Sequence, residues 1–354
     1  MLRPNGLGAL SGAFRRLGGA LIVLILQGLL GDWRSHEGTE VHWLGQSRAL
    51  AQVHQSVIHT VRPGDTLASI AQLYYGDPRR ESVLVSENGL NAQGGAAIVV
   101  GLRLIIPWTA YHRVQPGETW TELANRFYGD PRRANVLIEA NGAVAGEQPD
   151  VGAELRVPYP LRYIAGQGET LSKVAAPYFR DSRDGARRLR RFNHLRGSRV
   201  SRGQIVLVPI VDLLLSEDGR RVVAERTGLV PPTGETREAQ AHIDGQLPAL
   251  AEQMRSGRYT EAIALANRLL GTGQLTGNQL VTIQRHAATA YVALREEELA
   301  VDAFVEALKR QPHLELDTIS TSPSVMRQLE RARARLAPDE SDAPLDGAAE
   351  ATAD

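Results

Sequence analysis

Cysteine is absent from all 354 residues, which excludes disulfide bonds, thiolate metal sites and a cysteine nucleophile. Lysine is nearly absent too, because only Lys173 and Lys309 stand among the 40 basic residues. Aromatic residues make up 5% of the chain, and basic and acidic residues are equal in number at 40 each. The chain therefore has no net positive charge that would favour nucleic acid as a partner.

The motifs of common catalytic centres are also missing. The sequence contains no G-x-S-x-G nucleophile elbow, no H-E-x-x-H zinc motif and no phosphate-binding loop. Its histidines lack metal-ligand spacing, and no segment suggests the cleft with paired carboxylates that glycan cleavage requires. We predict that the protein is not an enzyme and needs no metal and no cofactor.

Only the amino terminus contains a long apolar run. Three arginines precede the stretch 17–30, LGGALIVLILQGLL, which only Gln27 interrupts. A membrane-spanning helix needs about 20 apolar residues, whereas a signal-peptide core is shorter. Residues 1–34 are therefore predicted to be a signal anchor that meets the membrane through 17–33, or a signal peptide; a buried core helix is the third alternative. Positive charge before the run predicts that the remainder is exported.

A pattern then occurs three times along the chain, after a predicted linker at 35–57. Each copy has a Gly-Asp-Thr or Gly-Glu-Thr sequence, and the three are spaced by 53 and 51 residues. Each copy carries an asparagine about 22 residues after its threonine and closes with an apolar stretch ending in proline. Three features in register over three copies indicate tandem modules of one fold.

The first copy shows what that fold should be. Residues 58–62 are typical of a strand, and Thr66 occupies a helix N-cap position. Apolar residues between 67 and 74 recur at helical spacing, and Gly76-Asp77-Pro78 ends this helix and begins another. Residues 102–106 return as a strand. We expect the order strand, helix, helix, strand, with the strands antiparallel and both helices on one face.

These segments resemble the LysM domain, at residues 58–107, 111–158 and 162–209. The third copy departs from the pattern, because it lacks the opening proline and reads Tyr178-Phe-Arg-Asp181 where the others have Tyr-Gly-Asp-Pro. The fold class is thus α+β, with three tandem βααβ modules before a helical domain. The resemblance implies binding of glycan that contains N-acetylglucosamine, chiefly peptidoglycan, in a shallow groove between the loop after strand one and the loop after helix two.

Glycine-containing loops let backbone N–H and C=O groups approach such a ligand closely. The same residues also have structural roles as turns, helix caps and helix ends, and the two roles are compatible. The positions that match the family's groove, and are predicted to bind glycan, are Gly64, Asp65, Thr66, Asn88 and Leu90, then Gly117, Glu118, Thr119, Asn141 and Ala143, then Gly168, Glu169, Thr170, Asn193 and Leu195.

The third copy is strongly basic. Between residues 162 and 209, ten arginines and one lysine face three acids, which leaves a net charge of +8. A solvated helix face is one interpretation; the other is contact with polyanions such as peptide-stem carboxylates, anionic lipid or lipopolysaccharide. The residues predicted to make that contact are Arg187, Arg188, Arg190 and Arg191.

The carboxyl-terminal third changes to helical periodicity. Residues 210–236 are predicted to be a linker or a small hairpin centred on Asp218-Gly219. Residues 237–337 resemble tetratricopeptide repeats, through alternating small and large residues such as Ala288, Tyr291 and Phe304. Residues 338–354 hold six acids and no basic residue, which predicts disorder.

Together these patterns predict a scaffold of the cell envelope, anchored in the inner membrane or secreted. Its modules would bind peptidoglycan, and its helical repeat would recruit a protein partner. Two alternatives remain open. One is a structural adaptor of a secretion or phage-tail-like assembly, and the other is a subunit of a cell-wall hydrolase.

Overall fold

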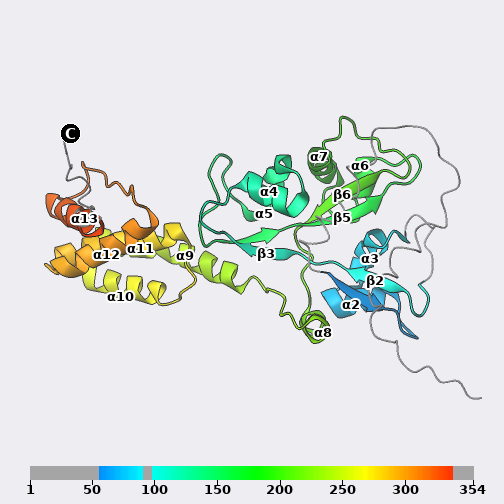
Figure 1. The fold of residues 1–354 in the computed structure, drawn as a ribbon, viewed down its shortest axis with the longest axis horizontal. Helices are drawn as coiled ribbons and strands as arrows, with labels where there is room; N and C mark the ends of the chain where they lie inside the picture. The colour runs from blue at the N-terminus through cyan, green and yellow to red at the C-terminus, as the bar shows by residue number, and fades with distance from the viewer. Residues whose placement is uncertain (1–55, 91–97, 338–354) are drawn as a thin grey trace, which may run out of the picture. The chain divides into compact units, whose positions relative to one another are not determined.

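The computed structural model describes residues 56–90 and 98–337. Over these residues the protein is mixed α/β, with three two-stranded sheets followed by a helical region (Figure 1). The predicted amino-terminal hydrophobic helix, nearly all of the linker at 35–57 and the acidic tail at 338–354 lie outside the described residues. Among the helices of 56–90 and 98–337, none combines the length and the apolar character that crossing a membrane requires.

Module 1 has the predicted order of strand, two helices and strand. Thr66 caps the first helix by accepting a hydrogen bond from the Ser69 backbone N–H, and the Ser69 hydroxyl accepts one from the Thr66 backbone in return. The first and last strands pair antiparallel, with Val57 opposite Ile106. Its elements are β1 (Val57–Thr60), α2 (Leu67–Tyr75), the 3-10 helix η1 (Pro78–Arg80), α3 (Glu81–Glu87) and β2 (Arg103–Ile106).

Module 2 repeats this arrangement. Thr119 and Glu122 form the capping box that their spacing predicts, and Gly129 ends the first helix in the left-handed conformation. Asp130 then caps the 3-10 helix, since its carboxylate accepts from the Arg132 backbone N–H. The elements are β3 (Ala110–Arg113), α4 (Trp120–Tyr128), η3 (Pro131–Arg133), α5 (Ala134–Asn141) and β4 (Glu154–Val157).

Module 3 uses different residues for the same chain path. Its first helix is short, and Asp181 caps the second by accepting from the backbone N–H groups of Arg183 and Asp184. Residues 159–161, which lie between the predicted bounds of modules 2 and 3, belong to the first strand of module 3 and pair with 208–210. The elements are α6 (Leu171–Ala175), α7 (Ser182–Phe192), β5 (Tyr159–Ile164) and β6 (Ile205–Ile210). In Figure 1 both helices lie on one side of this sheet.

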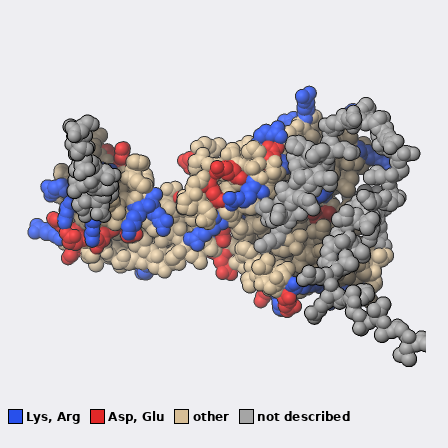
Figure 2. Space-filling view, viewed as in Figure 1, with Lys and Arg blue, Asp and Glu red and all other residues tan. Residues whose placement is uncertain are grey.

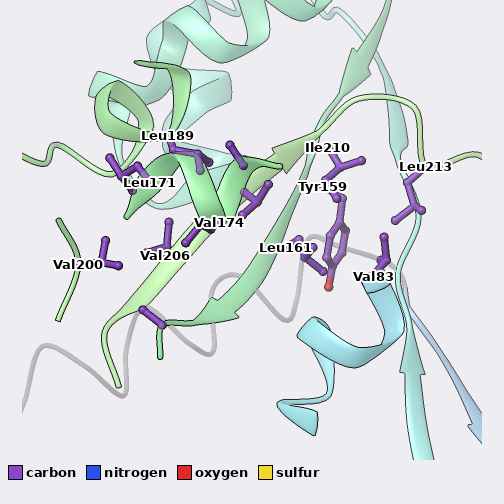
Figure 3. Close-up of a cluster of buried hydrophobic side chains, with 13 residues drawn as sticks. Val83, Tyr159, Leu161, Leu171, Val174, Leu189, Val200, Val206, Ile210 and Leu213 are labelled. Carbon is purple, nitrogen blue, oxygen red and sulfur yellow. The ribbon is translucent and has the colours of Figure 1, made fainter. Parts of the chain in front are cut away.

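Neighbouring modules share their hydrophobic cores. Val83 of α3, in module 1, belongs to the buried cluster of module 3 and lies beside Tyr159 and Leu161 (Figure 3). Phe192 of α7, in module 3, is buried in the cluster of module 2. Because a side chain of one module completes the core of another, these contacts resist independent motion of the modules.

The hairpin proposed around Asp218-Gly219 is wrong. These residues form the first turn of α8 (Glu217–Thr227), and the Ser216 hydroxyl caps it by accepting from the Gly219 backbone N–H. Two acids in the first turn favour this helix end electrostatically. The helix packs against module 1 so closely that a Cβ on Gly219 would lie 2.4 Å from the Tyr74 carbonyl oxygen. The close packing of α8 against module 1 therefore requires glycine at position 219, and no turn is involved.

The helical region has five helices among the described residues, and its two buried clusters fill the space between successive helices. Of the residues that carry the tetratricopeptide resemblance, Ala288 and Phe304 are fully buried and Tyr291 is partly buried. The helices are α9 (Glu235–Arg255), α10 (Tyr259–Leu270), α11 (Gly277–Ala293), α12 (Glu297–Arg310) and α13 (Pro323–Leu336).

Candidate glycan-binding grooves

An acidic side chain organises the loop after the first strand of module 1. The Asp65 carboxylate accepts from the His59 ring at 3.0 Å and from the Arg62 backbone N–H at 2.7 Å. The hydrogen bond from His59, followed by that from the Arg62 backbone, lowers the pKa of Asp65 below its usual value. The Asp65 side chain thus stabilises the turn through these two hydrogen bonds.

Modules 2 and 3 have equivalent contacts. Glu118 accepts from His112 at 2.6 Å and from the Gln115 backbone N–H at 2.9 Å. Glu169 accepts from the Tyr163 hydroxyl at 2.9 Å and from the Gly166 backbone N–H at 2.8 Å. Sequence reasoning did not assign a role to the histidines or to this tyrosine. The available signal was their constant position, six residues before the acid in every copy.

Each predicted asparagine links the second helix of its module to the closing strand by hydrogen bonds. The Asn88 amide donates to the carbonyls of Leu84 and Ile105, and its oxygen accepts from the Ile105 backbone N–H. Asn141 and Asn193 repeat all three bonds within their own modules. The Asn141 oxygen also accepts from the Arg237 guanidinium of α9 at 2.8 Å. Because these asparagine side chains already have partners within the protein, a ligand in the groove would meet mainly backbone.

The remaining predicted positions divide between cap, core and surface. Thr66, Thr119 and Thr170 cap helices. The Leu90 side chain is buried in the core of module 1, while Ala143 and Leu195 are partly buried against the cores of modules 2 and 3.

The turn glycines are the most open of the predicted positions. Gly64, Gly117 and Gly168 have positive φ angles of 89°, 85° and 71°, and a Cβ added to any of them would meet nothing within 4 Å. A ligand can approach the backbone there without obstruction.

The groove of module 3 is closed by its own chain. Leu171 N–H donates to the Ser198 carbonyl at 2.7 Å, and Val200 N–H donates to the Glu169 carbonyl at 3.4 Å. The loop after α7 is thus paired with the loop after β5, across the predicted groove. In module 2 the link is a side chain, because the Trp120 indole donates to the Glu147 carbonyl, and Val144 of the same loop is 61% exposed. In module 1 the residues that follow α3 include 91–97, which lie outside the described residues.

The four arginines predicted to contact polyanions do not form a uniform basic face. Arg187 and Arg188 pair with Asp184, and Arg191 pairs with Glu139 of module 2 at 2.9 Å. Arg190 alone of the four has no ion pair or side-chain hydrogen bond with any described residue. Figure 2 likewise shows basic and acidic side chains side by side on the described surface of that view.

A partly buried carboxyl joins modules 1 and 3 and gives their contact a pH dependence. Glu87 of α3 accepts from the Tyr159 hydroxyl at 2.8 Å and from the Arg162 backbone N–H at 3.2 Å. Burial raises the pKa of Glu87 above its usual value, and these two bonds oppose that rise only in part. The protonated form therefore favours the folded state.

We expect Glu87→Gln to remove this dependence, since an amide does not titrate. The contribution of Glu87 is fully present below its unfolded pKa of about 4.3 and declines as pH rises through the folded pKa. The free energy of unfolding of wild type minus that of the variant should therefore be largest near pH 4 and smaller at pH 7.5. Urea unfolding at both values measures it, with exposed Glu81→Gln as the charge control. A difference that grows with pH would contradict the assignment.

Two segments of the chain, residues 59–107 and 112–158, match the LysM domain family. Two curated proteins of Mycobacterium tuberculosis are similar to part of the chain: Esterase MT1326 of strain CDC 1551 / Oshkosh and Esterase Rv1288 of strain ATCC 25618 / H37Rv. Each is 33% identical over 124 residues, which is 35% of this chain and 27% of the relative. The chain thus spans about a quarter of the length of these relatives. No solved structure matches the chain significantly.

Proposed function

We propose that the protein binds peptidoglycan, or related glycan containing N-acetylglucosamine, without cleaving it. LysM domains generally bind such glycans, and two segments of this chain match that family. The observation that carries the proposal is the open glycine turn at Gly64 and Gly117, where a ligand would meet backbone groups that an internal hydrogen-bond network holds in place. We assign the glycan contacts to modules 1 and 2, and a structural role to the closed groove of module 3.

Two grooves in one chain favour tight binding to a polymer. A single shallow sugar site offers little apolar area and binds weakly, but tethering turns the second binding event into an intramolecular one. The gain is about 10²–10⁴-fold where the geometry permits both to engage. Shared cores between modules hold the grooves in a fixed relation, which reduces the conformational entropy lost on binding.

The helical region would serve as the platform for a protein partner, and we place the protein in the cell envelope, where LysM domains are typical. The tetratricopeptide-like spacing supports this role, because stacked helix pairs present extended concave surfaces. Attachment through residues 17–33 remains a prediction about a segment outside the described residues. A structural adaptor in a secretion or phage-tail-like assembly is the alternative in which the modules would contact protein.

Catalysis is the second candidate function, because the similar mycobacterial proteins are named esterases. The similarity covers about a quarter of each of them, so the name describes those longer proteins. In the described ranges, 56–90 and 98–337, no cluster of three His, Asp or Glu side chains could hold a metal ion.

Cosedimentation of the full chain with purified sacculi tests the binding proposal. We expect saturable binding that soluble chitin oligomers compete away, with no release of soluble fragments and no hydrolysis of a short-chain ester. A chain that stays in the supernatant at low salt would refute glycan binding. Release of sugar fragments or of acid from the ester would establish an enzyme instead.

A further inference from the structure

A groove lined by arginines runs between module 2 and module 3. Its first part is a cavity of about 350 Å³ between η3 and α5 on one side and α7 on the other. A second cavity of about 430 Å³ continues it and shares Val136, Glu139 and Arg188 as lining residues. We call the two together the inter-module groove. The arginines that line its first part are Arg132, Arg133, Arg188, Arg190 and Arg191.

The positive charge of this groove is only partly balanced. The Glu139 carboxylate forms ion pairs with Arg188, at 3.7 Å, and with Arg191, at 2.9 Å. The Asp130 carboxylate pairs with Arg132, at 2.9 Å, and also contacts the His194 ring, at 2.8 Å. Asp184 also pairs with Arg188, and Asp130 lies 4.0 Å from Arg133. Of the five arginines that line the first cavity, only Arg190 has no carboxylate partner among the described residues. The second cavity is lined by Arg180 and by further acids, Asp181 and Asp212, so the unpaired positive charge lies in the first cavity.

Arg133 is held in place before any ligand arrives. Its guanidinium donates to the carbonyls of Phe192 and Tyr128, at 3.1 and 2.8 Å, and its carbon lies 5.0 Å from the centre of the Phe192 ring. Its nearest carboxylate oxygen is that of Asp130, at 4.0 Å. Burial lowers the pKa of Arg133, because removing the charged guanidinium from water costs free energy. An anion in the groove would offset that cost.

We propose that the inter-module groove binds carboxylates of the short peptides that peptidoglycan carries. This inference rests on the proposed function and names a second part of the same ligand. A concave site of this volume fits a few residues of a peptide. In the view of Figure 2 basic and acidic side chains lie side by side on the described surface, unlike the continuous basic face that binds an anionic membrane. The second cavity is lined in part by Phe179, Pro209 and Ile210, which suits the aliphatic part of a peptide.

The distance between the glycan groove of module 2 and the inter-module groove suits such a ligand. Helix α5 reaches both, since Asn135 lines the arginine cavity and Asn141 lies at the predicted sugar loop. Six residues of helix rise about 9 Å, and a helix is about 10 Å across. Four extended residues span about 13 Å. The α5 residues at the sugar loop and in the cavity lining are therefore separated by less than the length of an extended tetrapeptide.

Titration calorimetry on the full chain tests the inference with four probes: a disaccharide carrying a tetrapeptide, the same disaccharide without peptide, the free tetrapeptide, and anionic phospholipid vesicles. We expect wild type to bind the peptide-bearing disaccharide about tenfold more tightly than the bare one, because a charge-assisted contact is added. Arg190→Gln should bind the two disaccharides equally. The matched control is Arg196→Gln, an exposed arginine of the same module outside the cavity lining, and it should keep the wild-type preference.

Several outcomes would overturn the inference. One is a wild-type chain that binds both disaccharides equally; another is an Arg190→Gln variant that keeps the preference. Vesicle binding that exceeds peptide binding and is lost with Arg190 would assign the groove to lipid headgroups instead. If the bare disaccharide is not bound at all, the proposed glycan function fails. The peptide site then stands only if the free tetrapeptide binds in an Arg190-dependent way.

Discussion

Replacing Gly117 with alanine is expected to weaken binding to sacculi about tenfold, and Gly64→Ala should do the same in module 1. The added methyl group meets no protein atom within 4 Å, so it projects into the space that a sugar would occupy. When both grooves are altered, the intramolecular second event is lost as well, and the combined loss should reach about 10²-fold. Sacculus-binding isotherms of the full chain measure the effect.

The chain provides a matched control for these two substitutions. Gly168 has the same turn position, a positive φ of 71° and an equally open surrounding, but its module has a groove closed by backbone hydrogen bonds. Alanine at any of the three glycines should cost about 1–2 kcal/mol of stability, because a side chain at positive φ is strained. Only Gly64→Ala and Gly117→Ala should lose glycan. Equal loss of binding in Gly168→Ala would show that strain, and not the ligand surface, is responsible.

The largest effect on stability is expected from Phe192→Ala. This ring is 1% exposed and belongs to the buried cluster of module 2 although it comes from α7 of module 3. It contacts Tyr128 edge-on at 5.3 Å between ring centres and lies under the Arg133 guanidinium. Truncation should cost about 3–5 kcal/mol and should uncouple the two modules. Calorimetry should then show the single unfolding transition dividing into two.

Phe127→Ala is the control that distinguishes the loss of a buried ring from the loss of coupling between modules 2 and 3. Phe127 is also buried in module 2 but comes from its own helix α4. Its truncation should lower stability and leave one cooperative transition. If Phe192→Ala also unfolds in one transition, modules 2 and 3 are held together by contacts other than this ring.

Local signals in the sequence predicted most elements of the modules, because their causes are local. Thr66 and Thr119 cap helices through N–H groups three residues away, and each cap can be recognised from its own spacing. The Asp218-Gly219 prediction failed although local helix signals were present, namely Ser216 at the N-cap and two acids in the first turn. What no local pattern contains is the reason for glycine at position 219, which is the close approach of Tyr74, 145 residues earlier in the chain.

The candidate site shows the same division. Repeat spacing located the loops, and two of the three copies lie in segments that match the LysM family. Spacing did not reveal that Asn88 and its equivalents bond inward, nor that module 3 closes its groove with Ser198 and Val200. The arginines near 190 were recognised as a cluster. Which of them remain unpaired depends in part on Glu139, which pairs with Arg188 and Arg191 from another module.

The return of the chain to module 1 has a consequence for biogenesis. Ser216 donates to the Leu73 carbonyl, and Leu215 and Val223 complete the apolar cluster of the first module. A chain emerging from a ribosome therefore presents module 1 with an unfilled flank until about 115 further residues have followed. Contacts of such long sequence separation form slowly, and an exposed apolar flank invites association in the meantime. Folding of module 1 is thus tied to the synthesis of α8, which lies outside the loops predicted to bind glycan.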